Sequence, residues 1–309
     1  MTKINFFGTH NFARAMLQTL FDSGIFEIVS VFTSPDRPVG REQKINESAV
    51  KILAGQNKLK IIQPETLKNF DFSPHADVDL NIICEYGLII PKDIVETPKY
   101  GSINVHPSLL PKYRGASPIQ AALINGDTQT GVTIMLIDEK MDHGPILNQE
   151  KVNIGPNDTY PVLSEKLIPV AARLLLKTTD DWMHKKITPQ IQDENAVTFC
   201  KLFTKQDGYV DFTKMTASQI YNLYRGLIIW PGIWTTFSNK RFKLLEIKLG
   251  EKNTSVGTAM TENNQIFIGC LDQKTIEIIK IQPEGKKEMN AKEFLNGYKN
   301  LLCSSVSNS

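Results

Sequence analysis

Two polar side chains, Asn104 and His106, close the apolar run INVH at residues 103–106. Alternate side chains of a strand share a face, so Asn104 and His106 are expected to emerge together while Ile103 and Val105 point into the core. Enzymes built on parallel sheets hold their ligands outside the carboxyl ends of the strands. The pair therefore lies where an amide and an imidazole could act on a bound molecule. A capped strand end with a hydrogen-bonded histidine is the alternative interpretation.

A carboxylate from a nearby loop could act together with Asn104 and His106. Residues 131–147, GVTIMLIDEKMDHGPIL, run from a strand-like segment into a loop whose Gly-Pro pair indicates a defined shape. Loops on a rigid sheet commonly carry catalytic groups. Asp142 within hydrogen-bonding distance of His106 would orient the imidazole and favour its charged form. Asp138 and His143 are alternatives for the roles of Asp142 and His106.

Short apolar segments alternate with helical repeats along the first half of the chain. KINFFG (3–8) and FEIVSVFT (26–33) are strand-like and flank a helical segment, and VDLNIICEYG (78–87) follows as a buried strand. Strand, helix and strand within about thirty residues are typical of a βαβ unit. The pattern predicts an α/β domain with a Rossmann-like parallel sheet, whose strand ends would position the polar side chains.

The chain is predicted to form two domains. Residues 1–186 would form the larger, catalytic domain, which ends in a long helix over 159–183 with a kink or break at Pro169. Residues 187–205 have little periodicity and are predicted to be a linker. Residues 206–309 contain short strand-like segments separated by Gly and Asn turns, which predict a smaller C-terminal β-barrel of the OB type.

Composition excludes several classes of protein. The 309 residues carry a formal net charge of +2, and a small basic excess after residue 206 is compatible with a polyanionic partner. The four cysteines show no CxxC spacing, so neither a metal site nor a disulfide framework is predicted. No apolar run is long enough to cross a membrane, and the N-terminus lacks a secretory pattern, which predicts a cytoplasmic protein. The turn at Gly8 lacks GxGxxG, which argues against a nicotinamide dehydrogenase.

The segment that carries the polar residues resembles a known family. NVHPSLLPKYRGASPIQAALINGDTQTGVTIMLIDEKMDHGPIL (104–147) is similar to the signature region of the folate-dependent formyltransferases. The resemblance covers essentially the whole chain. Further segments resemble the branch of that family that acts on methionyl-tRNA: FFGTHNFA (6–13), TSPDRPVGR (33–41), YGLIIPK (86–92), LFTKQDGYVDF (202–212), WPGIW (230–234) and IQPEGKKEM (281–289). The assignment to this branch rests on WPGIW and IQPEGKKEM, which both lie in the predicted second domain.

The resemblance implies a reaction and its residues. A formyl group would pass from the co-substrate 10-formyltetrahydrofolate to the α-amine of methionyl-initiator tRNA, without a metal. Asn104 and His106 would donate hydrogen bonds to the oxyanion of the tetrahedral intermediate, each worth about 3 kcal/mol, and Asp142 would assist the histidine and relay the proton. The folate-binding residues of the family correspond to two apolar stretches: Ser108, Leu109, Leu110 and Pro111, and Leu88, Ile89 and Ile90.

The resemblance also implies a tRNA contact. A loop after the second strand would bind phosphates through Arg37, Arg41 and Lys44. Glu42 and Glu47 depart from the more basic loop that is usual in the family, and would weaken the attraction to phosphates. A monomer with no membrane partner is expected.

Two other departures and two alternative functions stay open. Glu85 stands where the family commonly has a small residue, and Ile228 and Ile229 stand where an Asn-Pro pair is common. One alternative is a formyltransferase that acts on a small amine, either a sugar nucleotide or glycinamide ribonucleotide. The other is a folate- or RNA-binding protein without catalysis. The second-domain segments disfavour the first alternative, and the complete Asn, His and Asp set disfavours the second.

Overall fold

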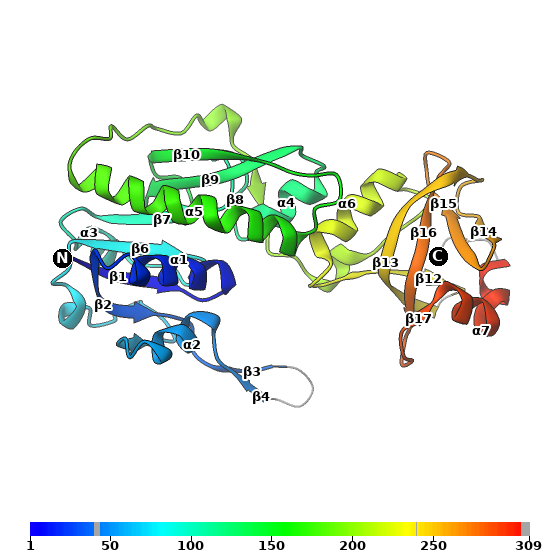
Figure 1. The fold of residues 1–309 in the computed structure, drawn as a ribbon, viewed down its shortest axis with the longest axis horizontal. Coiled ribbons are helices and arrows are strands. Elements are labelled where there is room, and N and C mark those ends of the chain that lie inside the picture. Colours follow the sequence, from blue (N-terminus) through cyan, green and yellow to red (C-terminus); the bar gives the residue numbers. More distant parts are fainter. Residues whose placement is uncertain (40–43, 239, 304–309) are drawn as a thin grey trace. The chain divides into compact units, whose positions relative to one another are not determined.

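The computed structural model describes residues 1–39, 44–238 and 240–303 (Figure 1). The chain packs as two compact units. The first comprises Met1–Pro118, Gln129–Asn153 and Ser164–Lys201, and the second comprises Ile119–Thr128, Ile154–Leu163 and the chain from Leu202 onward. Two short segments of the sequence that was assigned to the catalytic domain thus pack with the C-terminal half.

A seven-stranded sheet forms the centre of the first unit, in the order β10-β9-β7-β6-β1-β2-β5. The five strands from β7 to β5 are parallel, which confirms the Rossmann-like fold class. The last two strands differ from the expected parallel arrangement, since β9 runs antiparallel to β7 and β10 antiparallel to β9. The strands are β1 (Thr2–Gly8), β2 (Phe26–Phe32), β5 (Ile61–Ile62), β6 (Leu80–Cys84), β7 (Ser102–His106), β9 (Gln129–Leu136) and β10 (Ile146–Asn153).

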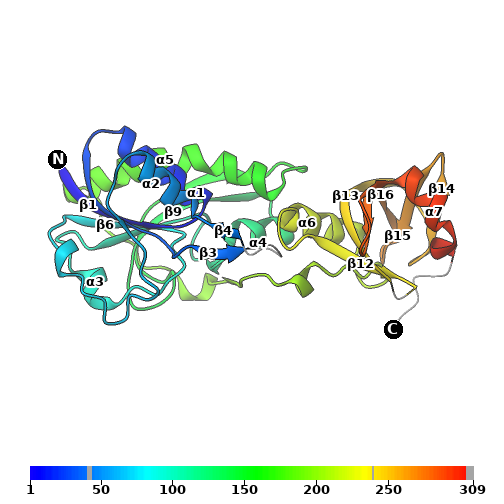
Figure 2. The same ribbon diagram turned by 90° about the horizontal axis from the view of Figure 1, so that it is seen from below.

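Helices cover both faces of this sheet. Figure 2 shows α1, α2 and α5 on one side and α3 on the other. α1 packs an apolar face that includes Phe12, Met16 and Leu20, and Ser48 caps α2 by accepting a hydrogen bond from Lys51 N–H. α5 runs through Pro169 without a break, so of the two expected effects of this proline the break is wrong and the kink stays a prediction. The helices are α1 (Asn11–Asp22), α2 (Ala49–Gln56), α3 (Lys92–Glu96), α4 (Pro118–Ile124) and α5 (Tyr160–Met183).

Buried polar side chains tie four parallel strands together on the face that α3 covers. Asn5 donates to Asn81 Oδ1 (3.1 Å) and to the carbonyl of His75 (2.9 Å), and Asn81 donates to Ser102 Oγ (3.1 Å). Ser30 Oγ lies 2.8 Å from His75 Nδ1. Buried polar groups need such partners, because an unpaired one loses its hydration without compensation. The network therefore fixes the lateral register of β2, β1, β6 and β7.

In the part of the chain that the structure describes, two short pairs of strands and three 3₁₀ turns lie outside the two main sheets. A two-stranded hairpin, β3 (Arg37–Val39) with β4 (Lys44–Asn46), follows β2. A second pair joins β8 (Arg114–Gly115) to β11 (Phe199–Cys200), which belongs to the predicted linker. Short 3₁₀ turns occur at Ser73–His75, Glu194–Ala196 and Lys205–Gly208.

The second unit contains an antiparallel sheet together with helices, which confirms a smaller C-terminal domain built on β-strands. Its strands follow the order β12-β13-β16-β15-β14, and β17 also pairs with β16. Aromatic and aliphatic side chains fill its core, among them Phe212, Phe237, Phe242 and Phe294. The elements are α6 (Ala217–Leu227), β12 (Ile233–Phe237), β13 (Lys240–Asn253), β14 (Ala259–Glu262), β15 (Gln265–Gly269), β16 (Lys274–Pro283), β17 (Met289–Asn290) and α7 (Ala291–Cys303).

Among the described residues, no helix combines the length and the apolar character needed to cross a membrane.

The aromatic cluster at the carboxyl ends of β1 and β2 provides a test of the core. Phe32 is 0% exposed, and its ring stacks on Phe7 with 4.4 Å between centroids. We expect Phe32→Ala to lower the free energy of unfolding by about 3–5 kcal/mol, because a large buried ring is replaced by a cavity. Urea unfolding measures the change. Phe21→Ala, at a half-exposed position of α1, is the matched control and should have little effect; equal losses for the two variants would contradict this assignment of the core.

Candidate active site

β7 presents Asn104 and His106 on the same face of the sheet, two and four residues after Ser102 of the polar network. His106 is only 4% exposed, and its Nε2 lies 2.9 Å from the carbonyl oxygen of Tyr113. A carbonyl can only accept, so Nε2 carries the hydrogen and donates it to Tyr113. Nδ1 is therefore the ring nitrogen that faces the rest of the site.

The carboxylate of Asp142 meets both side chains. Its Oδ1 lies 3.7 Å from His106 Nδ1 and accepts a hydrogen bond from Asn104 Nδ2 at 3.3 Å. Its Oδ2 accepts a hydrogen bond from the backbone N–H of Gly115 at 2.8 Å. The structure thus brings together the three side chains that the sequence analysis singled out.

The two alternative residues of the same loop pair with each other. His143 Nδ1 lies 2.6 Å from Asp138 Oδ2, and His143 Nε2 lies 3.5 Å from Glu194 Oε1. Asp142 rather than Asp138 therefore faces His106. The sequence pattern left this choice open.

Tight backbone contacts shape the loop that carries Asp142. Asp142 has φ 49°, in the left-handed region that is strained for residues other than glycine. A Cβ at Gly144 would lie 1.9 Å from the carbonyl oxygen of Leu136, so only glycine lets the loop approach β9 this closely. The backbone strain at Asp142 is thus part of the geometry that directs its carboxylate toward His106.

The turn after His106 is fixed by side chains of β9 and β10 that the sequence analysis did not find. Thr133 Oγ1 donates to the carbonyl of Ser108 at 2.6 Å and accepts from Leu110 N–H at 3.1 Å. Gln149 donates to the carbonyl of Leu110 and to Thr133 Oγ1, at 2.7 and 2.8 Å. Ser108 and Leu110 are buried, whereas Leu109 and Pro111 are half-buried. Side-chain access in this turn is therefore confined to Leu109 and Pro111.

The other expected folate segment follows β6. Leu88 and Ile90 are half-buried and pack against the aromatic cluster of Phe7, which also receives Ile137 from the start of the Asp142 loop. Ile89 is 91% exposed. An apolar strip at residues 88–90 thus lies against the same cluster as the loop that carries the carboxylate.

Glu85, between β6 and this strip, is a half-buried residue at φ 47°, and its Oε2 atom is buried. Burial raises the pKa of the Glu85 carboxyl to about 7, although the backbone N–H groups of Phe12 and Ala13 act in the opposite direction. Within the described part of the chain, Glu85 Oε2 has no hydrogen-bond partner. The desolvation of this oxygen explains why burial dominates.

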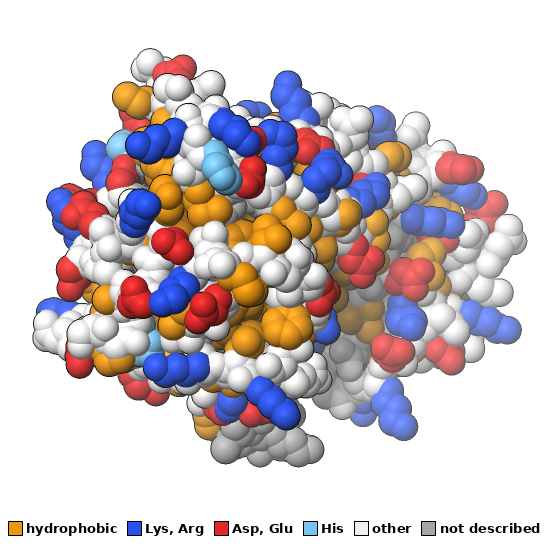
Figure 3. All heavy atoms as spheres, turned by 60° about the vertical axis from the view of Figure 1, so that its left-hand side comes forward, with side chains coloured by type: hydrophobic (Ala, Val, Ile, Leu, Met, Phe, Trp, Pro, Cys, Tyr) orange, Lys and Arg blue, Asp and Glu red, His pale blue; other side chains and the backbone are white. Residues whose placement is uncertain are grey.

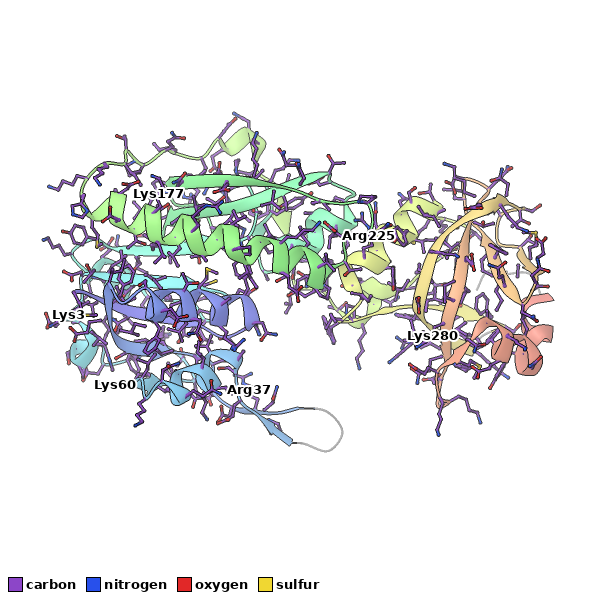
Figure 4. All side chains as sticks on the ribbon, in the orientation of Figure 1. Lys3, Arg37, Lys60, Lys177, Arg225 and Lys280 are labelled. Carbon is purple, nitrogen blue, oxygen red and sulfur yellow. The ribbon has the colours of Figure 1, made fainter. Side chains whose placement is uncertain are left out.

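Two of the three residues expected to contact tRNA, Arg37 and Lys44, belong to the β3–β4 hairpin. Arg37 is exposed at the start of β3, and its guanidinium lies 3.6 Å from Glu65 (Figure 4). Lys44 belongs to β4, whereas Arg41 and Glu42 lie outside the described residues.

Glu47, one of the two acids expected to oppose phosphate binding, has a cationic partner. Its carboxylate lies 2.9 Å from Lys51 Nζ, which also pairs with Asp36. This ion pair offsets only part of the negative charge of Glu47, because Lys51 is shared with Asp36.

Within residues 1–39, 44–238 and 240–303, no group of three or more His, Cys, Asp or Glu side chains could hold a metal ion.

Comparisons with known proteins identify the family. A family model described as formyl transferase matches residues 2–179, and one described as formyl transferase, C-terminal domain, matches residues 202–299. A methionyl-tRNA formyltransferase of Thermodesulfovibrio yellowstonii is 41% identical over 96% of each chain. The chain belongs to the methionyl-tRNA formyltransferase family. A family member from Caldicellulosiruptor saccharolyticus is 39% identical, covering 96% of this chain and 97% of its own.

Solved structures of similar fold are more distant. The sugar 3N-formyl transferase WlaRD, in the presence of dTDP and 5-N-formyl-THF, matches with a TM-score of 0.66 at 22% identity, over 93% of this chain and 99% of its own. An N-formyltransferase from Helicobacter canadensis, in complex with folinic acid and dTDP-3-aminofucose, matches with a TM-score of 0.67 at 21% identity, over 92% of this chain and 100% of its own. At this identity they show the fold alone.

Glu85 yields a prediction about pH and stability. Its pKa is raised on folding, so the native state keeps the proton where the unfolded state has lost it, and stability falls as pH rises from about 4.5 through about 7. Glu85→Gln removes the ionisable group but keeps an acceptor for the N–H groups of α1. We expect the variant to match the wild type in urea unfolding at pH 4.5, and to exceed it by up to about 3 kcal/mol at pH 8.

The control for this prediction is Glu27→Gln, at an exposed position of β2. Its stability relative to the wild type should change little between the two pH values. A difference between Glu85→Gln and wild type that did not grow with pH would show that Glu85 is already charged without penalty.

Proposed function

We propose that this chain transfers the formyl group of 10-formyltetrahydrofolate to the α-amine of methionyl-initiator tRNA. The observation that carries the proposal is the convergence of Asn104, His106 and Asp142 in a chain that aligns over nearly its full length with methionyl-tRNA formyltransferases. The alignment includes the C-terminal domain. The two solved formyltransferases of similar fold also align over more than nine-tenths of this chain, but at 21–22% identity, so the 41% identity to a methionyl-tRNA formyltransferase favours tRNA over a small amine as the formyl acceptor.

The support for a folate donor comes from the fold and from the apolar stretches. The two solved structures of similar fold are each described with a formylated folate. Here the strip at residues 88–90 offers aliphatic side chains, and the turn at residues 108–111 offers the half-buried Leu109 and Pro111. A flat heterocycle is suited to such a surface, because its faces pack on aliphatic side chains while main-chain groups bind its edge.

Each of the three polar side chains then has a distinct task. Asn104 Nδ2 carries a second hydrogen besides the one donated to Asp142, and this hydrogen can bind the oxyanion that forms when the amine attacks the formyl carbon. A donor from His106 has to be Nδ1, because Nε2 donates to Tyr113. One such donor is worth about 3 kcal/mol of transition-state stabilisation.

Asp142 is placed to move the proton. The attacking amine loses a proton as the carbon–nitrogen bond forms, and N10 of the folate must gain one as it leaves. The carboxylate beside His106 Nδ1 can accept the first proton and return it to N10, directly or through water, so no net proton is consumed. A binding protein without catalysis would have no use for this convergence.

The tRNA is proposed to bind through Arg37, Arg41 and Lys44, because cationic side chains neutralise phosphates. On the face of the molecule in Figure 3, basic and acidic side chains are interspersed, so this face carries no large field of one sign. On this face, phosphate binding is therefore assigned to particular side chains rather than to a continuous positive surface. A cytoplasmic, monomeric enzyme stays a prediction.

The catalytic proposal predicts the effect of one carboxylate. In an assay with purified protein, 10-formyltetrahydrofolate and methionyl-initiator tRNA, we expect Asp142→Asn to lower kcat by about 10²–10³, because the proton acceptor beside His106 is lost. His106→Ala should lose a similar amount. Glu139→Gln, an exposed acid of the same loop, is the control and should retain wild-type kcat. Wild-type turnover in Asp142→Asn would remove Asp142 from the mechanism, and an inactive wild type would refute the proposed function.

The tRNA contact predicts a separate effect. We expect Arg41→Ala to raise KM for tRNA several-fold, to leave KM for folate unchanged, and to reduce the slope of log affinity against log salt by about one. Lys177→Ala, an exposed cation of α5, is the control. An unaltered tRNA dependence in Arg41→Ala would place the contact elsewhere.

A further inference from the structure

The segment expected to be a linker contributes a buried side chain to the loop that carries Asp142. Gln192 is 5% exposed. Its amide nitrogen donates to the backbone carbonyl of Asp142 at 2.8 Å and to that of Gly144 at 2.9 Å. The two N–H bonds of one amide thus hold the backbone on both sides of His143.

The other end of the same amide is held by Arg114, which is 3% exposed. Gln192 Oε1 accepts from Arg114 Nε at 3.1 Å and from Nη2 at 2.9 Å. The guanidinium also pairs with Glu194, at 2.7 Å between Nη2 and Oε1. Every hydrogen of the Gln192 amide therefore has a partner, and its carbonyl oxygen is oriented by a planar guanidinium.

The same short strand also binds the Asp142 carboxylate. Gly115, next to Arg114 in β8, donates its N–H to Asp142 Oδ2. A Cβ at Gly115 would lie 2.1 Å from the carbonyl oxygen of Cys200, which shows how closely the linker packs on β8. Arg114 and Gly115 therefore link the linker segment to the loop through both the backbone and the carboxylate of Asp142.

Asp142 needs this restraint because its backbone is strained. A non-glycine residue in the left-handed region is disfavoured by roughly 1–2 kcal/mol, and persists where surrounding contacts determine it. Relaxation of φ would rotate the side chain away from His106 and Asn104. The contacts that oppose this rotation include the two hydrogen bonds from Gln192 to the loop backbone, and those from Gly115 and Asn104 to the carboxylate.

We propose that Gln192 is a positioning residue for formyl transfer: anchored by Arg114, it holds the Asp142 backbone so that the carboxylate faces His106. The inference rests on the proposed function, in that Asp142 takes part in the reaction. It differs from a purely structural role, in which Gln192 would only satisfy two buried carbonyls. A structural role predicts loss of stability, whereas positioning predicts loss of kcat that depends on Asp142.

Gln192→Glu separates the hydrogen bonds that Gln192 accepts from Arg114 from those that it donates to the Asp142 loop. A carboxylate still accepts from Arg114, but it cannot donate to the carbonyls of Asp142 and Gly144. We expect kcat to fall 10- to 100-fold, with both KM values within about threefold of wild type. Gln192→Met, which is similar in length and uncharged, replaces this variant if the new charge prevents folding. Gln190→Glu is the matched control, since the Gln190 side chain is exposed and only its backbone pairs with Ile146.

A double-mutant cycle tests whether the loss of kcat in Gln192→Glu arises through Asp142. If Gln192 acts through Asp142, the variant that combines Gln192→Glu with Asp142→Asn should lose no more kcat than Asp142→Asn alone. Losses that multiply, or wild-type kcat in Gln192→Glu, would overturn the inference while leaving the proposed function intact.

A measurement without turnover decides the inference independently of the proposed function. The Gly115 N–H is bound by the Asp142 carboxylate, so its hydrogen exchange, followed by NMR, reports whether the carboxylate stays in place. We expect exchange at least tenfold faster in Gln192→Glu than in wild type or Gln190→Glu, with thermal midpoints within a few degrees. Unchanged protection at Gly115 would refute the positioning role even if the protein formylated no tRNA.

Discussion

The Asp142 carboxylate is the group on which the proposed site depends. One oxygen faces His106 and Asn104 of β7, and the other is bound by the Gly115 N–H of β8. A charged group with 15% side-chain exposure is stable only when it is paired, and these partners come from segments that are distant in sequence. The active geometry is therefore a property of how a loop is held against a sheet, rather than of any one segment.

The direction of β9 explains why this loop needs so much support. β9 runs antiparallel to β7, with Leu136 beside Ile103, so the loop leaves the sheet near the amino end of β7. Ile137 N–H bonds to the carbonyl of Ser102 there. The chain must then double back over the sheet face to bring Asp142 to His106. A strained residue and a glycine that contacts β9 are the consequence of that reversal.

The segment 187–205 shows the limits of periodicity as a guide. The segment has no regular repeat, and the structure gives it one 3₁₀ turn, the two-residue strand β11 and the start of a second turn at Lys205. Its side chains nevertheless do more than connect two parts of the chain. Gln192 is buried, and Thr198 Oγ1 accepts a hydrogen bond from Tyr113 N–H, beside the carbonyl that holds His106. Irregular backbone can pack as closely as a strand when side chains satisfy its polar groups.

The sequence by itself determined the α/β class, the second β domain, and the common face of Asn104 and His106, because alternation along a strand is a local property of the backbone. The resemblance of several sequence segments to known proteins then indicated the family. Only the tertiary structure shows that Asp142 rather than Asp138 faces His106, and that the Nδ1 atom of His106 is the ring nitrogen nearer to Asp142. It also shows that the side chains of Thr133, Gln149 and Gln192 hold the surrounding turns. These contacts join residues far apart in the chain, and their partners depend on strand direction and loop path, which no local pattern of residues encodes.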